Sequence, residues 1–175
     1  MIESSYLSAI VLTQITPCLA DPDRIIITGR PSCPLDDVLP YLASLPDVMG
    51  FNPDSGTLTF RRPKGFMTLY SRRIVITQVK DEAEAEMLLG TLTEAVNATW
   101  ENRHSLKPVQ TRKKPPGHLD LYALLPQTNC KACGETTCLA FAVGLVTGAR
   151  SVEECGPLGE IPEYQDRLQA LEAML

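Results

Sequence analysis

Four cysteines in the C-terminal third of the chain have the type and spacing that could do chemistry. Cys130, Cys133, Cys138 and Cys155 form a C-x2-C-x4-C-x16-C run. The loops between the first three thiols are too short to place them far apart, and the fourth thiol follows an insert of helix length. Four thiolates gathered in this way are the ligand set of a cubane iron-sulfur cluster. The spacing therefore predicts that these four residues bind one 4Fe-4S cluster, as its cofactor-binding and metal ligands.

Two other uses of the four thiols remain open. A structural zinc site usually pairs its ligands as two short knuckles, whereas sixteen residues separate Cys138 from Cys155 and no histidine substitutes nearby. A disulfide framework is typical of small, core-poor chains in oxidising compartments, whereas 44% of this sequence is hydrophobic. The pattern favours the iron-sulfur cluster over both alternatives.

The stretch LLPQTNCKACGETTCLAFAVGLVTG, followed by CGPL, resembles a known 4Fe-4S domain. That domain is found in the large subunit of the corrinoid iron-sulfur protein and in the B subunit of the Rnf electron-transport complex. The resemblance covers about residues 119–158, less than a quarter of the chain, and implies that the same four cysteines are the cluster ligands. It does not extend to a corrinoid-binding barrel, so corrinoid binding is not implied. The full length also resembles small standalone iron-sulfur proteins of anaerobic bacteria and archaea, in which an α/β segment precedes this module.

Residues next to the first three cysteines predict how their thiols are positioned. Gly134 lets the backbone turn tightly after Cys133 and aim N–H groups at sulfur. The apolar run 139–146 predicts a short buried helix that could also cover a cluster, and Gly148 is typical of the residue that ends a helix.

A capped turn is predicted immediately before the fourth cysteine, Cys155. Ser151 and Glu154 match a capping box. The turn that they open would deliver Cys155 to the site.

Upstream of the cysteines, the hydrophobic pattern predicts a domain of mixed α and β structure. Runs rich in β-branched and aromatic residues predict about five strands, at residues 6–14, 24–28, 57–61, 66–70 and 73–79. The last run is apolar on both faces, as expected of a central strand. Most connections are too short for crossovers, so the sheet is predicted to be mostly antiparallel. A short helix at residues 38–45 would be capped by Asp36 or Asp37.

A long helix is expected to pack on this sheet. Asp81 with Glu84 would open it at about residue 82, and apolar residues recur at helical spacing as far as residue 102. The predicted fold class is therefore α+β: a mostly antiparallel sheet with covering helices, followed by a small helical iron-sulfur cluster domain.

The segment RHSLKPVQTRKKPPG, residues 103–117, separates these two parts. It contains five Lys or Arg, three Pro and no Asp or Glu. This composition predicts a solvated linker, with the docking of an acidic redox partner as the alternative use of its charge. The predicted domains are an α/β domain at 1–102, a basic Pro-rich linker at 103–117 and a 4Fe-4S cluster-binding domain with a C-terminal helix at 118–175.

Several chemical motifs are missing from the sequence. It has neither a G-x-x-x-x-G-K-[ST] loop nor a G-x-G-x-x-G fingerprint, and His104 and His118 are its only histidines. Cys18 and Cys33 are the only other cysteines. They are interpreted as small buried residues, with a second metal or substrate site that uses both as the alternative. Two thiols alone cannot complete a second cubane.

The composition also limits location and partners. No run approaches the roughly 18 apolar residues of a membrane span, and Pro17 stands where a processing site at Cys18 would need a small residue. A net charge of −5, without aromatic platforms in basic surroundings, argues against nucleic acid. We therefore expect a cytoplasmic protein with neither a membrane nor a nucleic acid as partner.

Four cysteine ligands leave no iron open for catalysis, so an enzyme is the less favoured class. The favoured function is a low-potential one-electron carrier or electron-delivery subunit, with a redox protein or metalloenzyme as its partner. The alternative is an accessory protein for the assembly or activation of a metalloenzyme. A reversible one-electron wave would favour the first function, and loss of the intact cluster to an acceptor would favour the second.

Overall fold

The computed structural model describes residues 5–19 and 21–175, which form two compact units. The first, called here the sheet unit, contains the described residues up to Phe60 together with Gly65–Lys114. The second, called the cysteine unit, contains Arg61–Lys64 and Pro115–Leu175. Within the described ranges, no helix combines the length and the apolar composition that crossing a membrane requires.

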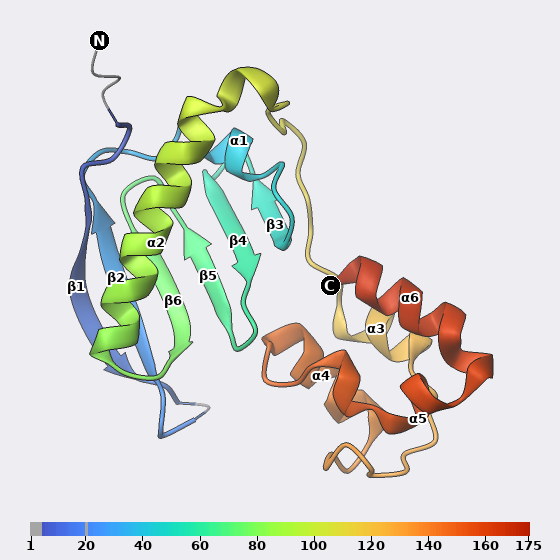
Figure 1. The fold of residues 1–175 in the computed structure, drawn as a ribbon. Coiled ribbons are helices and arrows are strands. Elements are labelled where there is room, and N and C mark those ends of the chain that lie inside the picture. Colours follow the sequence, from blue (N-terminus) through green and yellow to red (C-terminus); the bar gives the residue numbers. More distant parts are fainter. Residues whose placement is uncertain (1–4, 20) are drawn as a thin grey trace. The chain divides into compact units, whose positions relative to one another are not determined.

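The sheet unit is built on one six-stranded antiparallel sheet, in the order β1-β2-β6-β5-β4-β3 (Figure 1). The strands are β1 Ile10–Pro17, β2 Ile25–Pro31, β3 Val48–Asn52, β4 Thr57–Arg61, β5 Phe66–Leu69 and β6 Ile74–Val79. The prediction of an α+β fold with a mostly antiparallel sheet is confirmed. Strand β6 lies inside the sheet, between β2 and β5, as its two apolar faces predicted.

The sequence prediction misses one strand and misplaces another. Strand β3 is the sixth strand; Gly50 interrupts its short apolar run, and glycine weakens a strand pattern. Strand β1 begins at Ile10 and runs to Pro17 rather than spanning residues 6–14. Proline is tolerated there because β1 is an edge strand and Pro17 ends it.

The short helix α1, Leu39–Leu42, is also shorter than predicted. Its N-cap residue is Val38, so the prediction that Asp36 or Asp37 caps it is wrong. The carboxylate of Asp36 instead accepts a hydrogen bond from the Ser71 hydroxyl, which removes it from the helix end.

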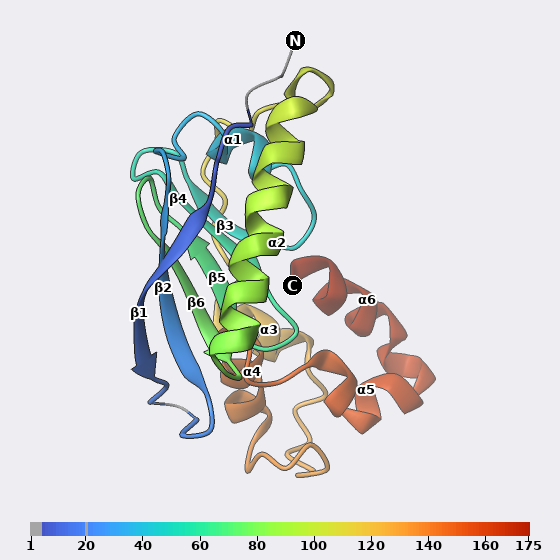
Figure 2. The ribbon, with the colours of Figure 1, turned by 60° about the vertical axis from the view of Figure 1, so that its left-hand side comes forward.

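Helix α2, Glu82–Glu101, lies across one face of the sheet (Figure 2). Asp81 caps it as predicted, because the carboxylate accepts a hydrogen bond from the backbone N–H of Glu84 at 2.9 Å. The residues that α2 buries are Ala85, Leu89, Leu92, Val96 and Thr99. Gly29 of β2 permits the close approach of this helix, since a Cβ at that position would lie 3.0 Å from Leu89.

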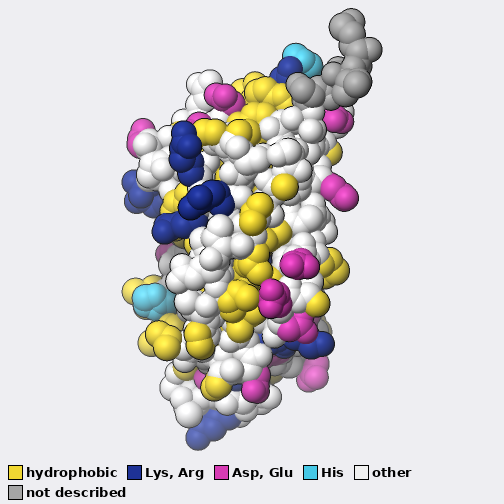
Figure 3. Space-filling view, turned by 90° about the vertical axis from the view of Figure 1, so that its left-hand side faces the viewer, with side chains coloured by type: hydrophobic (Ala, Val, Ile, Leu, Met, Phe, Trp, Pro, Cys, Tyr) yellow, Lys and Arg dark blue, Asp and Glu magenta, His cyan; other side chains and the backbone are white. Residues whose placement is uncertain are grey.

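The edge strand β1 and helix α2 border an open hollow of the sheet unit. Ile10 and Leu12 line it from the strand, and Glu82, Glu86 and Glu94 line it from the helix. On the side of the molecule drawn in Figure 3, hydrophobic side chains (yellow) run beside a group of acidic ones (magenta). This edge of the sheet is therefore mixed apolar and acidic in character.

The segment predicted as a linker is hydrogen-bonded to the sheet unit. The backbone N–H of Val109 donates to the Pro40 carbonyl at 2.9 Å, and Lys113 exchanges two backbone hydrogen bonds with Phe51 at 2.9 Å each. The Lys113 ammonium also donates to the Val48 carbonyl. The segment is therefore bound to α1 through Val109 and to β3 through Lys113, and the domain boundaries drawn through it stay a prediction.

Between residues 115 and 175, the regular elements of the cysteine unit are helices joined by loops. Its elements are α3 His118–Leu124, α4 Cys138–Thr147, η2 Val152–Glu154, α5 Gly156–Glu160, η3 Pro162–Tyr164 and α6 Gln165–Met174. Its buried core consists of Leu121, Leu125, Phe141, Ala142, Leu145, Val152, Cys155, Leu158 and Leu171. One of the four cysteines is thus part of the core itself.

The run 139–146 was predicted to form a buried helix, and α4 does contain it. The helix buries only one face, because Leu139 and Val143 are 39% and 44% exposed while Phe141 and Leu145 are buried. Gly148 ends the helix, as predicted, in the left-handed conformation with φ 72°.

Candidate metal centre

All four cysteines of the C-x2-C-x4-C-x16-C run line a single pocket of the cysteine unit. The pocket is a partly enclosed hollow, with Leu125, Phe141 and Pro157 among its apolar lining residues. Cys130 and Cys133 come from the loop between α3 and α4, Cys138 is the first residue of α4, and Cys155 lies between η2 and α5. The fold therefore brings together the four residues that the sequence singled out.

The thiols surround the pocket rather than meet at one point. Among the residues that the structure describes, no three His, Cys, Asp or Glu side chains are gathered closely enough to hold a single metal ion.

The loop that carries Cys130 and Cys133 has an unusual backbone. Gln127, Asn129 and Lys131 have φ values of 60°, 50° and 63°, and Gly134 has φ 85°. A non-glycine residue in this left-handed region costs roughly 1–2 kcal/mol. Strained backbone of this kind persists only where the surrounding structure determines it, and it is often found at functional sites.

Gly134 performs the turn that the sequence predicts. Its N–H donates to the Lys131 carbonyl at 3.0 Å, which closes the turn around Cys133. The N–H that is directed at sulfur is that of Ala132, which hydrogen-bonds Cys130. Backbone N–H groups in tight turns commonly form concavities that bind anions, and such a concavity suits thiolate ligands.

Cys138 stands at the N-terminal end of a ten-residue helix. The Thr137 hydroxyl accepts a hydrogen bond from the N–H of Ala140 at 3.1 Å, and the Asn129 side chain accepts one from the N–H of Cys138 at 2.8 Å. The partial positive charge of a helix N-terminus favours a negatively charged ligand beside it.

Cys155 is delivered by the short turn η2. The Glu154 carboxylate accepts a hydrogen bond from the N–H of Ser151 at 3.3 Å, as the predicted capping box requires. The N–H of Cys155 donates to Val152 at 3.1 Å, and its carbonyl accepts from Leu158 at 3.1 Å. The backbone of the fourth cysteine is therefore fixed on both sides.

The thiols at the two ends of the run differ in environment. Cys130 is exposed, and its pKa is lowered first by the hydrogen bond from the Ala132 backbone and then by that from the Thr128 side chain. Cys155 is buried, and burial raises the pKa of its thiol. Charge on Cys133, Cys138 and Cys130 raises it further, which places all four thiols within electrostatic reach of one another.

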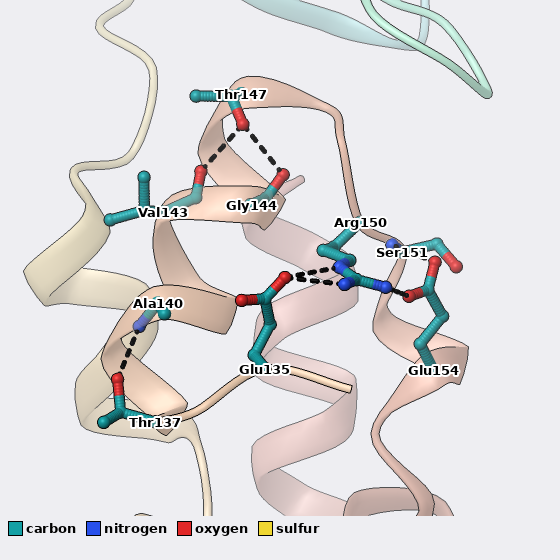
Figure 4. A network of polar contacts seen from close by, with 9 residues as sticks. All are labelled: Glu135, Thr137, Ala140, Val143, Gly144, Thr147, Arg150, Ser151 and Glu154. Carbon is teal, nitrogen blue, oxygen red and sulfur yellow. Dashed lines mark hydrogen bonds and ion pairs between the residues drawn. The ribbon is translucent and has the colours of Figure 1, made fainter. Parts of the chain in front are cut away.

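Sequence reasoning misses the polar cluster formed by Glu135, Arg150 and Glu154 (Figure 4). Arg150 Nε and Nη2 donate to the same oxygen of Glu135 at 2.9 and 2.6 Å, and Nη1 donates to Glu154 at 2.9 Å. The i,i+4 spacing of Arg150 and Glu154 is a signal that the sequence does contain. The pairing with Glu135 depends on the fold.

Cys18 and Cys33 belong to the sheet unit and do not line this pocket. Cys18 is buried, and Gln78 donates a hydrogen bond to its sulfur at 3.4 Å. Cys33 is half-buried and donates to the Tyr6 carbonyl at 3.2 Å. Their interpretation as small, mostly buried residues agrees with these surroundings.

Comparison with known proteins finds a family model that matches part of the cysteine unit. Residues 125–157, which contain all four cysteines, match the model of a protein family described as "Putative Fe-S cluster". An iron-sulfur cluster is thus indicated for the cysteine unit.

The related proteins are named as subunits of larger proteins or complexes. The chain is similar to the acetyl-CoA decarbonylase/synthase complex subunit gamma 1 of Methanosarcina thermophila, 42% identical over 33% of this chain and 12% of the relative. It is similar to the corrinoid/iron-sulfur protein large subunit of Moorella thermoacetica, 49% identical over 21% of this chain and 8% of the relative. The matches therefore cover about an eighth or less of these relatives. No solved structure matches the chain.

Proposed function

We propose that this chain binds one 4Fe-4S cluster on Cys130, Cys133, Cys138 and Cys155 and acts as a low-potential one-electron carrier. In this role it delivers electrons to a partner redox protein or metalloenzyme, in the cytoplasm. The observation that carries the proposal is that four thiols from three separate segments line one pocket. Four thiolates match the four irons of a cubane one to one, and part of the pocket wall is apolar.

Each segment of the pocket contributes a separate property. The cysteine loop aims the N–H of Ala132 at Cys130, and the N-terminus of α4 would favour the negative charge of a bound cluster. The buried position of Cys155 disfavours a free thiolate there, and coordination by a metal deprotonates a thiol outright. A cluster, when bound, would supply the redox chemistry. The chain's own residues hold it, balance its charge and leave its Cys130 side exposed to a partner.

An accessory role in assembly or activation of a metalloenzyme is the second candidate. The exposure of Cys130 favours it, because an exposed ligand is open to attack by an acceptor thiol. The relatives are subunits of multi-protein complexes, which is compatible with either role.

Anaerobic purification followed by iron, sulfide and zinc analysis tests the cluster. About four irons and four acid-labile sulfides per chain are expected from a cubane. Stoichiometric zinc without sulfide would refute the proposal. Two further experiments separate the two roles. A reversible one-electron wave in voltammetry supports delivery, whereas rapid transfer of the intact cluster to an added apo-acceptor supports assembly.

A further inference from the structure

One arginine contacts each of the segments that carry the four cysteines. The backbone N–H of Arg150 donates to the Gly144 carbonyl at 3.0 Å, on the helix that begins at Cys138. Its guanidinium binds Glu135, two residues after Cys133, and Glu154, which directly precedes Cys155. Figure 4 shows the guanidinium between the two carboxylates. A single side chain thus joins the C-x2-C corner to the fourth cysteine.

The aliphatic part of the Arg150 side chain, called here its stem, is held in place as the guanidinium is. A Cβ at Gly144 would lie 2.5 Å from Arg150 Cγ and 3.1 Å from its Cβ, so the stem lies directly against α4 at a position without a side chain. The side chains of Arg150 and Glu135 are only 30% and 29% exposed. Because a guanidinium is planar and always charged, such a partly buried pair is stronger than an exposed ion pair between flexible side chains.

We propose that Arg150 is the positioning residue of the four-cysteine site. It sets the place of Cys155 relative to Cys133 by binding Glu135 and Glu154 at once. Its charge also offsets that of the two carboxylates beside the pocket, which Glu135 itself lines. The positioning role concerns the chain alone, and the charge role rests on the proposed cluster.

The charges of the three side chains predict the direction in which each substitution shifts the midpoint potential. Two carboxylates and one guanidinium carry a net charge of −1. Arg150→Gln changes this to −2, and Glu135→Gln changes it to 0. Negative charge near a cluster disfavours addition of an electron, so Arg150→Gln should lower the midpoint potential and Glu135→Gln should raise it. A role confined to folding gives no reason for opposite shifts, because both variants weaken the same contact.

The positioning part is tested on the metal-free, reduced full chain by hydrogen-deuterium exchange. Hydrogen bonds to charged groups contribute enough that Arg150→Gln should speed exchange in the segment 152–158 by about tenfold or more. Arg150→Lys should recover part of the protection, and helix α2 of the sheet unit serves as the internal reference that should not change. Unchanged exchange at 152–158 in both Arg150→Gln and Glu135→Gln would overturn the positioning role.

The charge part is tested on the loaded chain by redox titration of wild type, Arg150→Gln, Glu135→Gln and Arg150→Lys. Arg30→Gln, a change of equal charge at an exposed residue that does not line the pocket, is the matched control and should shift the potential less than Arg150→Gln. Shifts of the same sign in Arg150→Gln and Glu135→Gln would overturn the charge part. If wild type binds neither iron nor sulfide, the proposed function fails, while the exchange measurement on the metal-free chain still decides the positioning role.

Discussion

The Asn129 side chain accepts a hydrogen bond from the backbone N–H of Cys138, with 2.8 Å between Oδ1 and N. Asn129 directly precedes the first cysteine of the run, and Cys138 is both the third cysteine and the first residue of α4. The bond therefore closes the cysteine loop onto the helix. Asn129 also has φ 50°, a conformation that asparagine tolerates better than most residues.

Asn129→Ala should loosen this closure. The change removes an acceptor for a helix-terminal N–H, which costs roughly 0.5–2 kcal/mol, and it places alanine in the left-handed region. We expect faster loss of bound iron to a chelator and a lower midpoint of urea unfolding. Asn129→Asp keeps an acceptor oxygen at the same position and should retain most of the stability. Equal behaviour of the two variants would show that the acceptor contributes nothing.

Substitution of single cysteines should separate ligands from bystanders. Cys138→Ala is expected to abolish the cluster or convert it to a smaller one, because it removes one of four thiolates. Cys18→Ala and Cys33→Ala should leave the absorption and EPR spectra of the cluster unchanged, since neither residue lines the pocket. Loss of the cluster in the Cys18 variant would refute the ligand assignment.

The metal-free chain should show an order of thiol reactivity. At pH 7, Cys130 should react with iodoacetamide first, because it is exposed and hydrogen bonds lower its pKa, which increases the thiolate fraction. Cys155 should react last, since burial both shields it and raises its pKa. Time-resolved peptide mass spectrometry gives the order. Labelling of Cys155 as fast as Cys130 would contradict the buried position of the fourth cysteine.

Strong periodic signals in the sequence predicted the corresponding elements well, and weak ones did not. Helix α2 was predicted to within one residue because Asp81 caps it and its apolar residues recur at helical spacing. Strand β3 was missed because Gly50 breaks its pattern and tertiary pairing with β4 stabilises it. Asp36 was a plausible cap by residue type, but its hydrogen bond to Ser71 joins residues far apart in the chain.

At the candidate site, too, local sequence signals predicted some features, and others depend on tertiary contacts. The spacing of the cysteines predicts which residues gather, and their pocket agrees with it. The left-handed conformations of Gln127 and Lys131 have no counterpart in residue preference, because neither type favours that region. The Arg150 contact with Glu135 spans fifteen residues and depends on the path of the chain after α4. Spacing can identify ligands, whereas the residues that hold them in place depend on the fold.

Gly144→Ala should destabilise the cysteine unit although alanine favours helices. The added Cβ would lie 2.5 Å from the Arg150 stem, and overpacking of this kind typically costs about 1–3 kcal/mol, more than the roughly 1 kcal/mol gained from helix propensity. Gly159→Ala in α5 is the matched control, because nothing lies within 4 Å of its Cβ position. Urea unfolding followed by circular dichroism should lower the midpoint for the first variant and raise it or leave it unchanged for the second.

Tyr6 should make the sheet unit sensitive to alkaline pH. Burial, followed by negative charge on Cys33, Asp37 and Asp36, raises the pKa of Tyr6 to about 12 from an ordinary value of 10.0. Between these two values the unfolded chain has lost a proton that the folded chain keeps, so the free energy of unfolding falls as the pH rises from about 10 to about 12. Below pH 10 this contribution is fully present.

Tyr6→Phe removes the titrating group together with the hydrogen bond that its hydroxyl donates to the Pro34 carbonyl at 2.6 Å. The variant should be less stable than wild type at pH 8, by about 1 kcal/mol for a lost hydrogen bond. The difference in the free energy of unfolding should shrink towards pH 11. In the wild type, loss of the Tyr6 proton stabilises the unfolded chain at that pH, whereas Tyr6→Phe has no such proton to lose. Fluorescence of Trp100, the single tryptophan, reports on the sheet unit during urea unfolding, and its ring centroid lies 4.7 Å from that of Tyr6. Parallel curves of stability against pH for the two proteins would show that Tyr6 does not titrate in this range.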